Sequence, residues 1–190
     1  MQVLLGSKSP RRQELLEAAG IVYSLVNIDS DEEFPADLDI EQVAEFLAIK
    51  KSKAFTNPLD NSILLTADTT VCIQGDIINK PENLDHAIQM LKKLSGQMHT
   101  VCTGVCFRTS TQLITYTDKT NVYFKELSDN DIEYYVNAFK PLDKAGAYGI
   151  QDWIGYIGVH KIEGDYFNVM GLPINRVFDS LKNLGNPSNS

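Results

Sequence analysis

The chain has 190 residues, of which 43% are hydrophobic and 22% are charged, the profile of a soluble globular protein with a substantial core. Its length fits one domain, or one domain with two lobes around a cleft. No apolar run approaches the roughly 18 residues that span a bilayer, and the short apolar stretch Val3–Leu5 lacks the basic flank of a signal peptide. We therefore expect a cytoplasmic protein with no membrane partner.

The charge balance argues against a second class of partner. Seventeen basic residues against twenty-five acidic ones give a net charge of −8, whereas a protein that binds nucleic acid polymers carries basic surface that neutralises phosphates. If this protein handles phosphates, it does so at a few concentrated points, with a metal ion offsetting charge. The cysteines Cys72, Cys102 and Cys106 are odd in number, which fits a reducing compartment.

The first elements alternate between strand and helix. Gln2–Gly6 is a buried strand, and Ser9–Ala19 is a helix whose first residue is a natural cap, followed by Pro10 at the first helical position and ended by Gly20. Ile21–Val26 alternates as a second strand. Ile40–Phe55 is helical, with an acidic first turn and a basic last turn that suit the helix dipole.

The middle of the chain contains the longest strands. Ile63–Ile73 is rich in β-branched residues and turns into a short partner strand at Ile77–Ile78. A helix over Leu84–Leu94 is ended by Gly96, and two long strands follow at His99–Arg108 and Gln112–Lys125.

Ser128 then caps a helix that reaches Phe139, with Asp131 three residues on. A strand at Tyr156–Ile162 precedes a last helix over Ile174–Leu181. This mixture predicts an α/β protein with a mixed sheet, because two adjacent long strands do not suit a purely parallel sheet. We expect one domain over residues 1–184 and a frayed polar tail at 185–190.

The first segment with chemical content is Leu5–Arg12. A strand runs through a turn containing Ser7 directly into the helix that begins near Ser9, so that unsatisfied backbone N–H groups and the positive end of the helix dipole point at one place. Arg11 and Arg12 lie beside it, and arginine matches phosphate oxygens with two hydrogen bonds. The segment therefore predicts an anion site, with a plain capped helix carrying solvated arginines as the alternative.

The second segment is Leu64–Val71, with Asp68 inside a strand. Asp is disfavoured there, and burying an unpaired carboxylate is costly. Asp68 therefore faces a cleft or pairs with a cation, for which Lys80 or a bound metal is a candidate. The alternative is an ion pair that serves stability alone.

Two further segments carry less information. The acidic run Asp29–Glu33 is either a solvated loop or a source of carboxylates for a hard cation such as Mg²⁺. The loop Asp143–Gln151 contains small residues that permit close backbone approach, and the Gln151 amide offers a donor and an acceptor. The chain contains no phosphate-binding P-loop, no dinucleotide GxGxxG motif and no serine-type triad.

Taken together, these segments resemble the Maf family of nucleotide pyrophosphatases. The resemblance covers residues 3 to about 184 in the family's order, and its motifs are Ser7–Leu16, Ala67–Val71, Lys80-Pro81, Leu94–His99, Asp143–Gln151 and Gly164–Pro173. It departs at Gly6, where Ala is usual and where we expect only a looser turn. It also departs at Asp152-Trp153, where Gly commonly follows Gln151.

The resemblance implies an elongated, twisted mixed sheet flanked by helices, with two lobes around a central cleft. It implies Mg²⁺-assisted hydrolysis of a nucleoside triphosphate to the monophosphate and pyrophosphate, in a cytoplasmic homodimer. Combining the resemblance with the residue chemistry, we expect Glu32 and Asp68 to hold the metal, with Mn²⁺ as the alternative ion. Asp68 resembles the family's proton acceptor, and Glu32, Lys51 and Lys80 fall at its other charged active-site positions. Glu33 adjoins Glu32, so the register there is open to a shift of one.

Three positions separate the family's branches. Here they are Arg11, Thr69 and Gln151, the combination of the branch that acts on dTTP and UTP. We expect Ser7, Ser9, Arg11 and Arg12 to bind the triphosphate, and Thr69 and Gln151 to bind the base. The alternatives are a pyrophosphatase that clears non-standard purine or methylated GTP nucleotides, and a non-catalytic nucleotide sensor linked to cell division.

Overall fold

The computed structural model describes residues 1–185 and divides them into two compact units. Unit 1 comprises residues 1–68, 103–118 and 171–185, and unit 2 comprises residues 69–102 and 119–170. Of the tail expected at 185–190, Gly185 is the last residue of a helix, and the rest lies outside the described residues. None of the helices within the described chain is long and apolar enough to cross a membrane.

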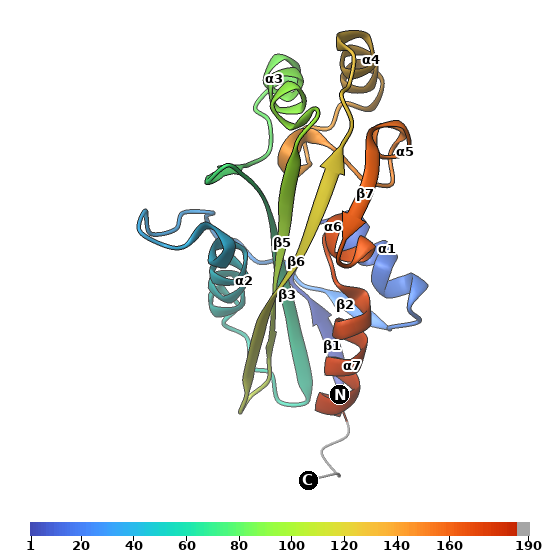
Figure 1. Ribbon diagram of the computed structural model, residues 1–190. Helices are drawn as coiled ribbons and strands as arrows, with labels where there is room; N and C mark the ends of the chain where they lie inside the picture. The colour runs from blue at the N-terminus through green and yellow to red at the C-terminus, as the bar shows by residue number, and fades with distance from the viewer. Residues whose placement is uncertain (186–190) are drawn as a thin grey trace. The chain divides into compact units, whose positions relative to one another are not determined.

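The strands form one mixed sheet of seven strands in the order β2-β1-β3-β5-β6-β7, with β4 paired to β3 (Figure 1). β1 runs parallel to β2 and to β3, whereas β4 is antiparallel to β3 and β7 is antiparallel to β6. The strands are β1 Gln2–Leu5, β2 Tyr23–Leu25, β3 Ser62–Ile73, β4 Asp76–Ile78, β5 Met98–Arg108, β6 Leu113–Phe124 and β7 Val159–Glu163. The predicted α/β class with a mixed sheet is confirmed.

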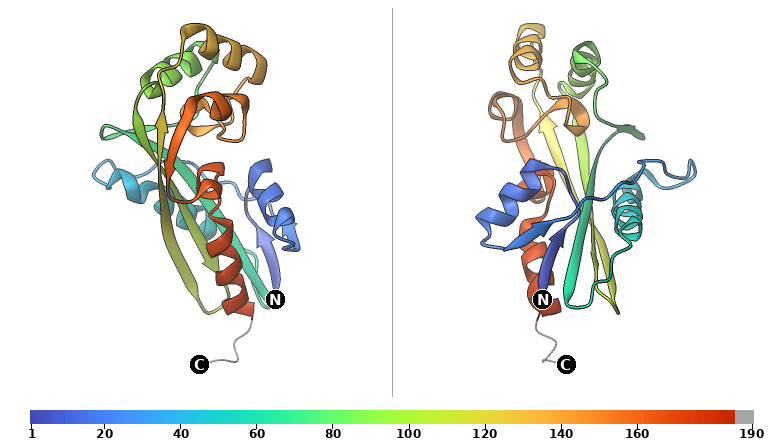
Figure 2. Two further views of the ribbon diagram at one scale, coloured as in Figure 1. Left: turned by 45° about the vertical axis from the view of Figure 1, so that its right-hand side comes forward. Right: turned by 180° about the vertical axis from the view of Figure 1, so that it is seen from behind.

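Unit 1 carries helices on both faces of its part of the sheet. Helix α2 (Val43–Ala54), preceded by the 3-10 turn Ile40–Gln42, lies on one face, and α1 (Pro10–Ala18) and α7 (Ile174–Gly185) lie on the other (Figure 2). The fully buried side chains of Leu5, Leu16 and Leu65 belong to the core of this unit. The loop between β1 and α1 and the loop that precedes α2 are therefore both anchored to the packed core of unit 1.

Unit 2 contains α3 (Leu84–Leu94) and α4 (Asp129–Phe139), which pack against each other. Ser128 caps α4 as predicted, because its hydroxyl accepts a hydrogen bond from the Asp131 amide at 3.2 Å and donates one to the Asp131 carboxylate at 2.7 Å. The unit also holds the 3-10 turn Ala145–Ala147 and the short helices α5 (Trp153–Gly158) and α6 (Tyr166–Met170).

One local prediction was wrong and one short helix was missed. The strand expected from Tyr156 begins only at Val159, since residues 153–158 form α5, and α6 was not predicted. Ser9 occupies the predicted cap position of α1, although its side chain makes no capping hydrogen bond within the described chain. Helices α5 and α6 have only six and five residues, which is too short to show a 3.6-residue period in the sequence.

The looser turn expected at Gly6 stays a prediction, and the structure adds that the position is crowded. A Cβ placed on Gly6 would lie 2.3 Å from the Ile28 Cδ1 atom and 2.9 Å from the Thr66 Cγ2 atom, both closer than van der Waals contact allows. The missing methyl group therefore leaves room for the Ile28 side chain.

Unit 2 contains a buried histidine that makes stability depend on pH. His99 is 1% exposed, its Nε2 atom lies 2.7 Å from the Tyr148 hydroxyl, and burial lowers its pKa from 6.5 to about 4. Between these two values the unfolded chain binds a proton that the folded chain excludes, so that stability falls as the pH drops from about 6.5 to about 4.

We expect this linkage to cost about 3 kcal/mol of unfolding free energy, since one pKa unit corresponds to about 1.4 kcal/mol. Urea unfolding at pH 7.5 and pH 4.5 measures it. In His99→Gln, which has no proton to bind, the difference between the two pH values should shrink by about that amount. An equal pH dependence in both proteins would show that other groups carry it.

Candidate active site

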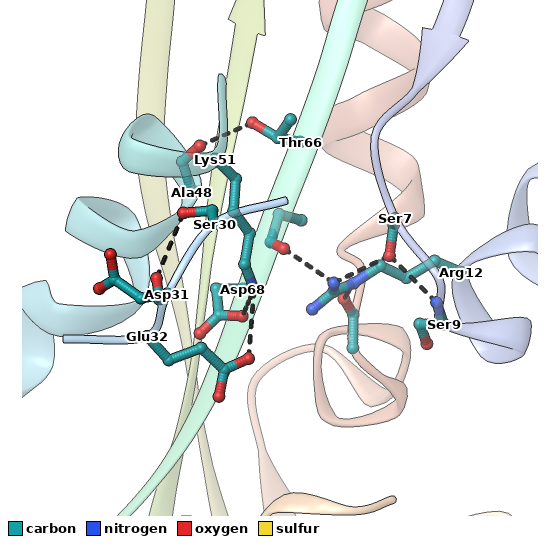
Figure 3. Close-up of polar contacts among 12 residues, drawn as sticks. Ser7, Ser9, Arg12, Ser30, Asp31, Glu32, Ala48, Lys51, Thr66 and Asp68 are labelled. Atoms are coloured by element: carbon teal, nitrogen blue, oxygen red, sulfur yellow. Dashed lines mark hydrogen bonds and ion pairs between the residues drawn. The ribbon is translucent and has the colours of Figure 1, made fainter. Parts of the chain in front are cut away.

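Strand β3 directs Asp68 toward helix α2. Side chains two residues apart in a strand share a face, and the Thr66 hydroxyl, two residues before Asp68, donates a 2.7 Å hydrogen bond to the Ala48 carbonyl of α2. Lys51 lies three residues beyond Ala48 and reaches the same point, where its Nζ atom is 2.5 Å from the Asp68 Oδ1 atom (Figure 3). The side chains are only 18% and 13% exposed, so the pair is largely sheltered from solvent.

The acidic loop supplies a second carboxylate to Lys51. The Glu32 Oε1 atom lies 3.6 Å from Lys51 Nζ. Its neighbours are held by Lys50, whose ammonium group pairs with the Asp31 carboxylate and donates to the Glu33 carbonyl at 2.8 Å. Lys50 therefore binds the loop on both sides of Glu32, and Glu32 is the residue of the acidic run that reaches Lys51.

Arg12 is buried in unit 1, which rules out the alternative of a solvated side chain. Its Nε atom donates to the Gly171 carbonyl at 2.8 Å, and its Nη1 atom donates to the Ala67 carbonyl at 2.8 Å and to the Ser7 hydroxyl at 3.2 Å. Burial lowers the pKa of Arg12, and the negative charges of Asp68 and Glu32 oppose that shift. The arginine and the two carboxylates thus belong to one electrostatic cluster.

The turn before α1 is ordered by its own serine. The Ser7 hydroxyl accepts a 3.3 Å hydrogen bond from the Ser9 amide and also the bond from Arg12 (Figure 3). Arg11 is half-buried at the start of the helix, and its positive charge further lowers the pKa of Arg12. Positive charge and a helix N-terminus therefore lie together, as an anion site requires.

The carboxylates of Glu32 and Asp68 are suited to a hard cation. Both approach Lys51 Nζ, at 3.6 and 2.5 Å, so two oxygen donors already gather around one positive charge. Within residues 1–185 no group of three or more His, Cys, Asp or Glu side chains is placed to hold a metal ion. Two carboxylates fit Mg²⁺, which takes one or two from the protein and completes its shell with phosphate oxygens and water.

The remaining predicted residues belong to unit 2. Thr69 follows Asp68 in β3 and is half-buried, whereas Lys80 follows β4 and is exposed. Gln151 lies in the loop before α5, and its Oε1 atom is buried and accepts no hydrogen bond from any described residue. A buried acceptor without a donor is costly to the protein alone and is satisfied when a ligand supplies an N–H group.

Two contributions to the site were not predicted from the residues alone. The sequence pattern attributes Lys50 to the helix dipole, whereas in the structure Lys50 also holds the acidic loop. The residue chemistry points to Lys80 as the cation beside Asp68, whereas in unit 1 Lys51 is that cation. The basic last turn of α2 (Lys50, Lys51 and Lys53) following an acidic run was the available signal. Lys50 and Lys51 form ion pairs with that acidic run as well as suiting the helix dipole.

Comparisons with known proteins identify the family of this chain. The profile of the family described as Maf-like protein matches residues 2–184. A protein of Phocaeicola vulgatus named dTTP/UTP pyrophosphatase is 46% identical, and the match covers 96% of each chain. A protein with the same name from Bacteroides thetaiotaomicron is 43% identical over 96% of this chain and 96% of its own. Another from Christiangramia forsetii is 44% identical over 97% of this chain and 95% of its own.

Proposed function

The chain belongs to the family of Maf-like proteins, and we propose that it is a nucleoside triphosphate pyrophosphatase that hydrolyses dTTP and UTP to the monophosphate and pyrophosphate. The observation that carries this proposal is the cluster in unit 1, where the Asp68 carboxylate lies beside Lys51 and is electrostatically coupled to the buried Arg12. The relatives named dTTP/UTP pyrophosphatase support the choice of substrate.

Each residue of the cluster has a task in this reaction. The turn from Ser7 to Arg12 binds the triphosphate through backbone N–H groups, hydroxyls and guanidinium groups. Lys51 neutralises charge that builds on the α-phosphate and on the departing pyrophosphate, and the resemblance assigns Lys80 to the same task. Asp68 accepts a proton from the attacking water. Phosphoryl transfer of this kind depends on positioning and electrostatics and needs no covalent intermediate.

Glu32 and Asp68 are the residues that would hold a divalent cation, Mg²⁺ or alternatively Mn²⁺. When bound, such an ion offsets phosphate charge and lowers the pKa of water. The family resemblance further supports a homodimer in the cytoplasm, and the three buried free cysteines suit a reducing compartment.

Base selection is assigned to Gln151 and Thr69. Uracil and thymine present an acceptor, a donor and an acceptor in a row, and their N–H group can donate to the buried Oε1 atom of Gln151. Cytosine has no ring N–H group and leaves the acceptor unsatisfied, which disfavours it strongly, whereas a guanine has an N–H group and must be disfavoured by its larger ring system. The resemblance assigns Thr69 a supporting contact through its hydroxyl.

A panel of nucleotides tests the proposal. We expect the purified protein with Mg²⁺ to convert dTTP and UTP to dTMP and UMP plus pyrophosphate, with kcat/KM above that for GTP and methylated GTP by about 10²-fold or more. Chromatography of the products and a pyrophosphate assay measure both points. Preference for methylated GTP would assign the chain to purine clearance, release of nucleoside diphosphate would indicate another hydrolase, and the absence of turnover would favour a nucleotide sensor.

A further inference from the structure

Gln151 occupies the third position of a tight turn. The four residues Gly149 to Asp152 are closed by a 3.0 Å hydrogen bond from the Asp152 amide to the Gly149 carbonyl, the bond typical of a β-turn. The second residue, Ile150, is buried, and α5 packs so closely on it that a Cβ on Gly155 would lie 1.9 Å from the Ile150 carbonyl oxygen. The backbone next to Gln151 is therefore held in place by its packing against α5.

One hydroxyl group binds both ends of this turn. The Tyr135 hydroxyl, on helix α4, accepts a 3.2 Å hydrogen bond from the Gly149 amide and donates a 2.8 Å hydrogen bond to the Asp152 Oδ2 atom. Tyr135 has no exposed surface, and burial together with the Asp152 carboxylate raises its pKa, so the hydroxyl keeps its proton. It is thus a donor and an acceptor at the same time.

The surroundings make this arrangement specific. Asp152 stands at the cap position of α5, yet its carboxylate makes no capping hydrogen bond within the described residues, because it is turned toward Tyr135 and toward Lys144, whose Nζ atom is 3.6 Å away. A Cβ on Gly149 would lie 2.6 Å from Asp152 Oδ2. The glycine therefore lets the carboxylate fold over the turn and reach the hydroxyl.

We propose that Tyr135 is a positioning residue for base selection, because its hydroxyl fixes the Gly149–Asp152 turn that presents Gln151. The inference rests on the proposed function, in which Gln151 contacts the base. A loosened turn displaces the Gln151 amide, and displacements of about 1 Å cost on the order of 10²-fold where geometry is critical. The triphosphate site in unit 1 contains neither Tyr135 nor this turn.

The test compares Tyr135→Phe with Gln151→Leu and with the control Tyr134→Phe, which removes a hydroxyl from the preceding, 55% exposed position of the same helix. The substrates are dTTP and 2-deoxyribose 5-triphosphate, which lacks a base. We expect Tyr135→Phe to raise the KM for dTTP at least about 10-fold while kcat and the kinetics of the base-free triphosphate change little. Tyr134→Phe should match the unaltered protein on both substrates.

A second pair of variants keeps the test decisive if Tyr135→Phe folds poorly. Asp152→Asn retains an oxygen that accepts from the hydroxyl and should keep the ratio of kcat/KM between the two substrates, whereas Asp152→Ala should lower it as Tyr135→Phe does. The inference is overturned if the ratio of kcat/KM for dTTP to kcat/KM for the base-free triphosphate is unchanged in Tyr135→Phe and Asp152→Ala. An equal fall of kcat/KM for both substrates, which a purely structural role would produce, leaves that ratio unchanged and also overturns it. If the unaltered protein does not favour dTTP over the base-free compound, or if Gln151→Leu keeps that preference, the base contact in the proposed function fails instead.

Discussion

Replacing Asp68 by asparagine is expected to leave the protein folded while lowering kcat for dTTP by about 10²–10⁴-fold, the usual cost of losing a positioned base. The amide is nearly the same size as the carboxylate, and its oxygen can still accept a hydrogen bond from Lys51, which now lies 2.5 Å from Asp68 Oδ1. It cannot accept a proton from water. Steady-state kinetics and a thermal melt of the same sample measure the two effects.

This variant separates catalysis from stability, the two explanations that the geometry of Asp68 allows. If the ion pair serves only stability, Asp68→Asn should have a lower melting temperature and unchanged turnover per folded molecule. Asp60→Asn is the matched control, because Asp60 is an exposed aspartate just before β3, and it should behave as the unaltered protein does. Normal hydrolysis by Asp68→Asn would remove this carboxylate from the role of base.

Replacing Arg12 by methionine is expected to have the largest effect on stability. The methionine side chain fills part of the space of the arginine stem but leaves the carbonyl groups of Gly171 and Ala67 without the donors that now lie 2.8 Å away. Since each unsatisfied buried group costs about 1–3 kcal/mol, losing the donors to two carbonyl groups should cost about 2–6 kcal/mol. Urea unfolding followed by circular dichroism measures it.

Arg12→Met should also impair hydrolysis at temperatures where it remains folded, by about 10²-fold, because a positive charge coupled to Asp68 is gone. Arg176→Met is the control for stability. The Arg176 side chain is 48% exposed and pairs with the 17% exposed Asp118 at 2.8 Å, and an ion pair with one solvent-exposed partner contributes about 1 kcal/mol. Equal losses in the two variants would show that burial of Arg12 brings no special contribution.

The sequence predicted the long elements well because their periods are clear. β3, β5 and β6 each run for eleven or twelve residues, and helix α3 carries its apolar residues on one face. The prediction failed where a helix spans less than two turns: residues 156–158, which we expected to begin a strand, complete the six-residue helix α5. Five-residue α6 has the same explanation.

For the site, the sequence supplied residue types and the structure supplied partners. The position of Asp68 inside a strand rich in β-branched residues indicated that its carboxylate needs a cation. The local sequence did not distinguish Lys51 from Lys80 as that cation, because the pairing depends on how α2 packs on β3. Arg12 illustrates the same limit. Two adjacent arginines at a helix start look equivalent in sequence, and only the packing of Gly171 and Ala67 around Arg12 shows that one of them is buried.

The central claim, that unit 1 directs water onto the α-phosphate of a pyrimidine nucleoside triphosphate, is tested most directly by hydrolysing dTTP in ¹⁸O-labelled water and weighing both products by mass spectrometry. Attack at the α-phosphate places one ¹⁸O atom in dTMP and leaves pyrophosphate unlabelled, which is the predicted result. Label in pyrophosphate, or dTDP and labelled phosphate as products, would contradict it.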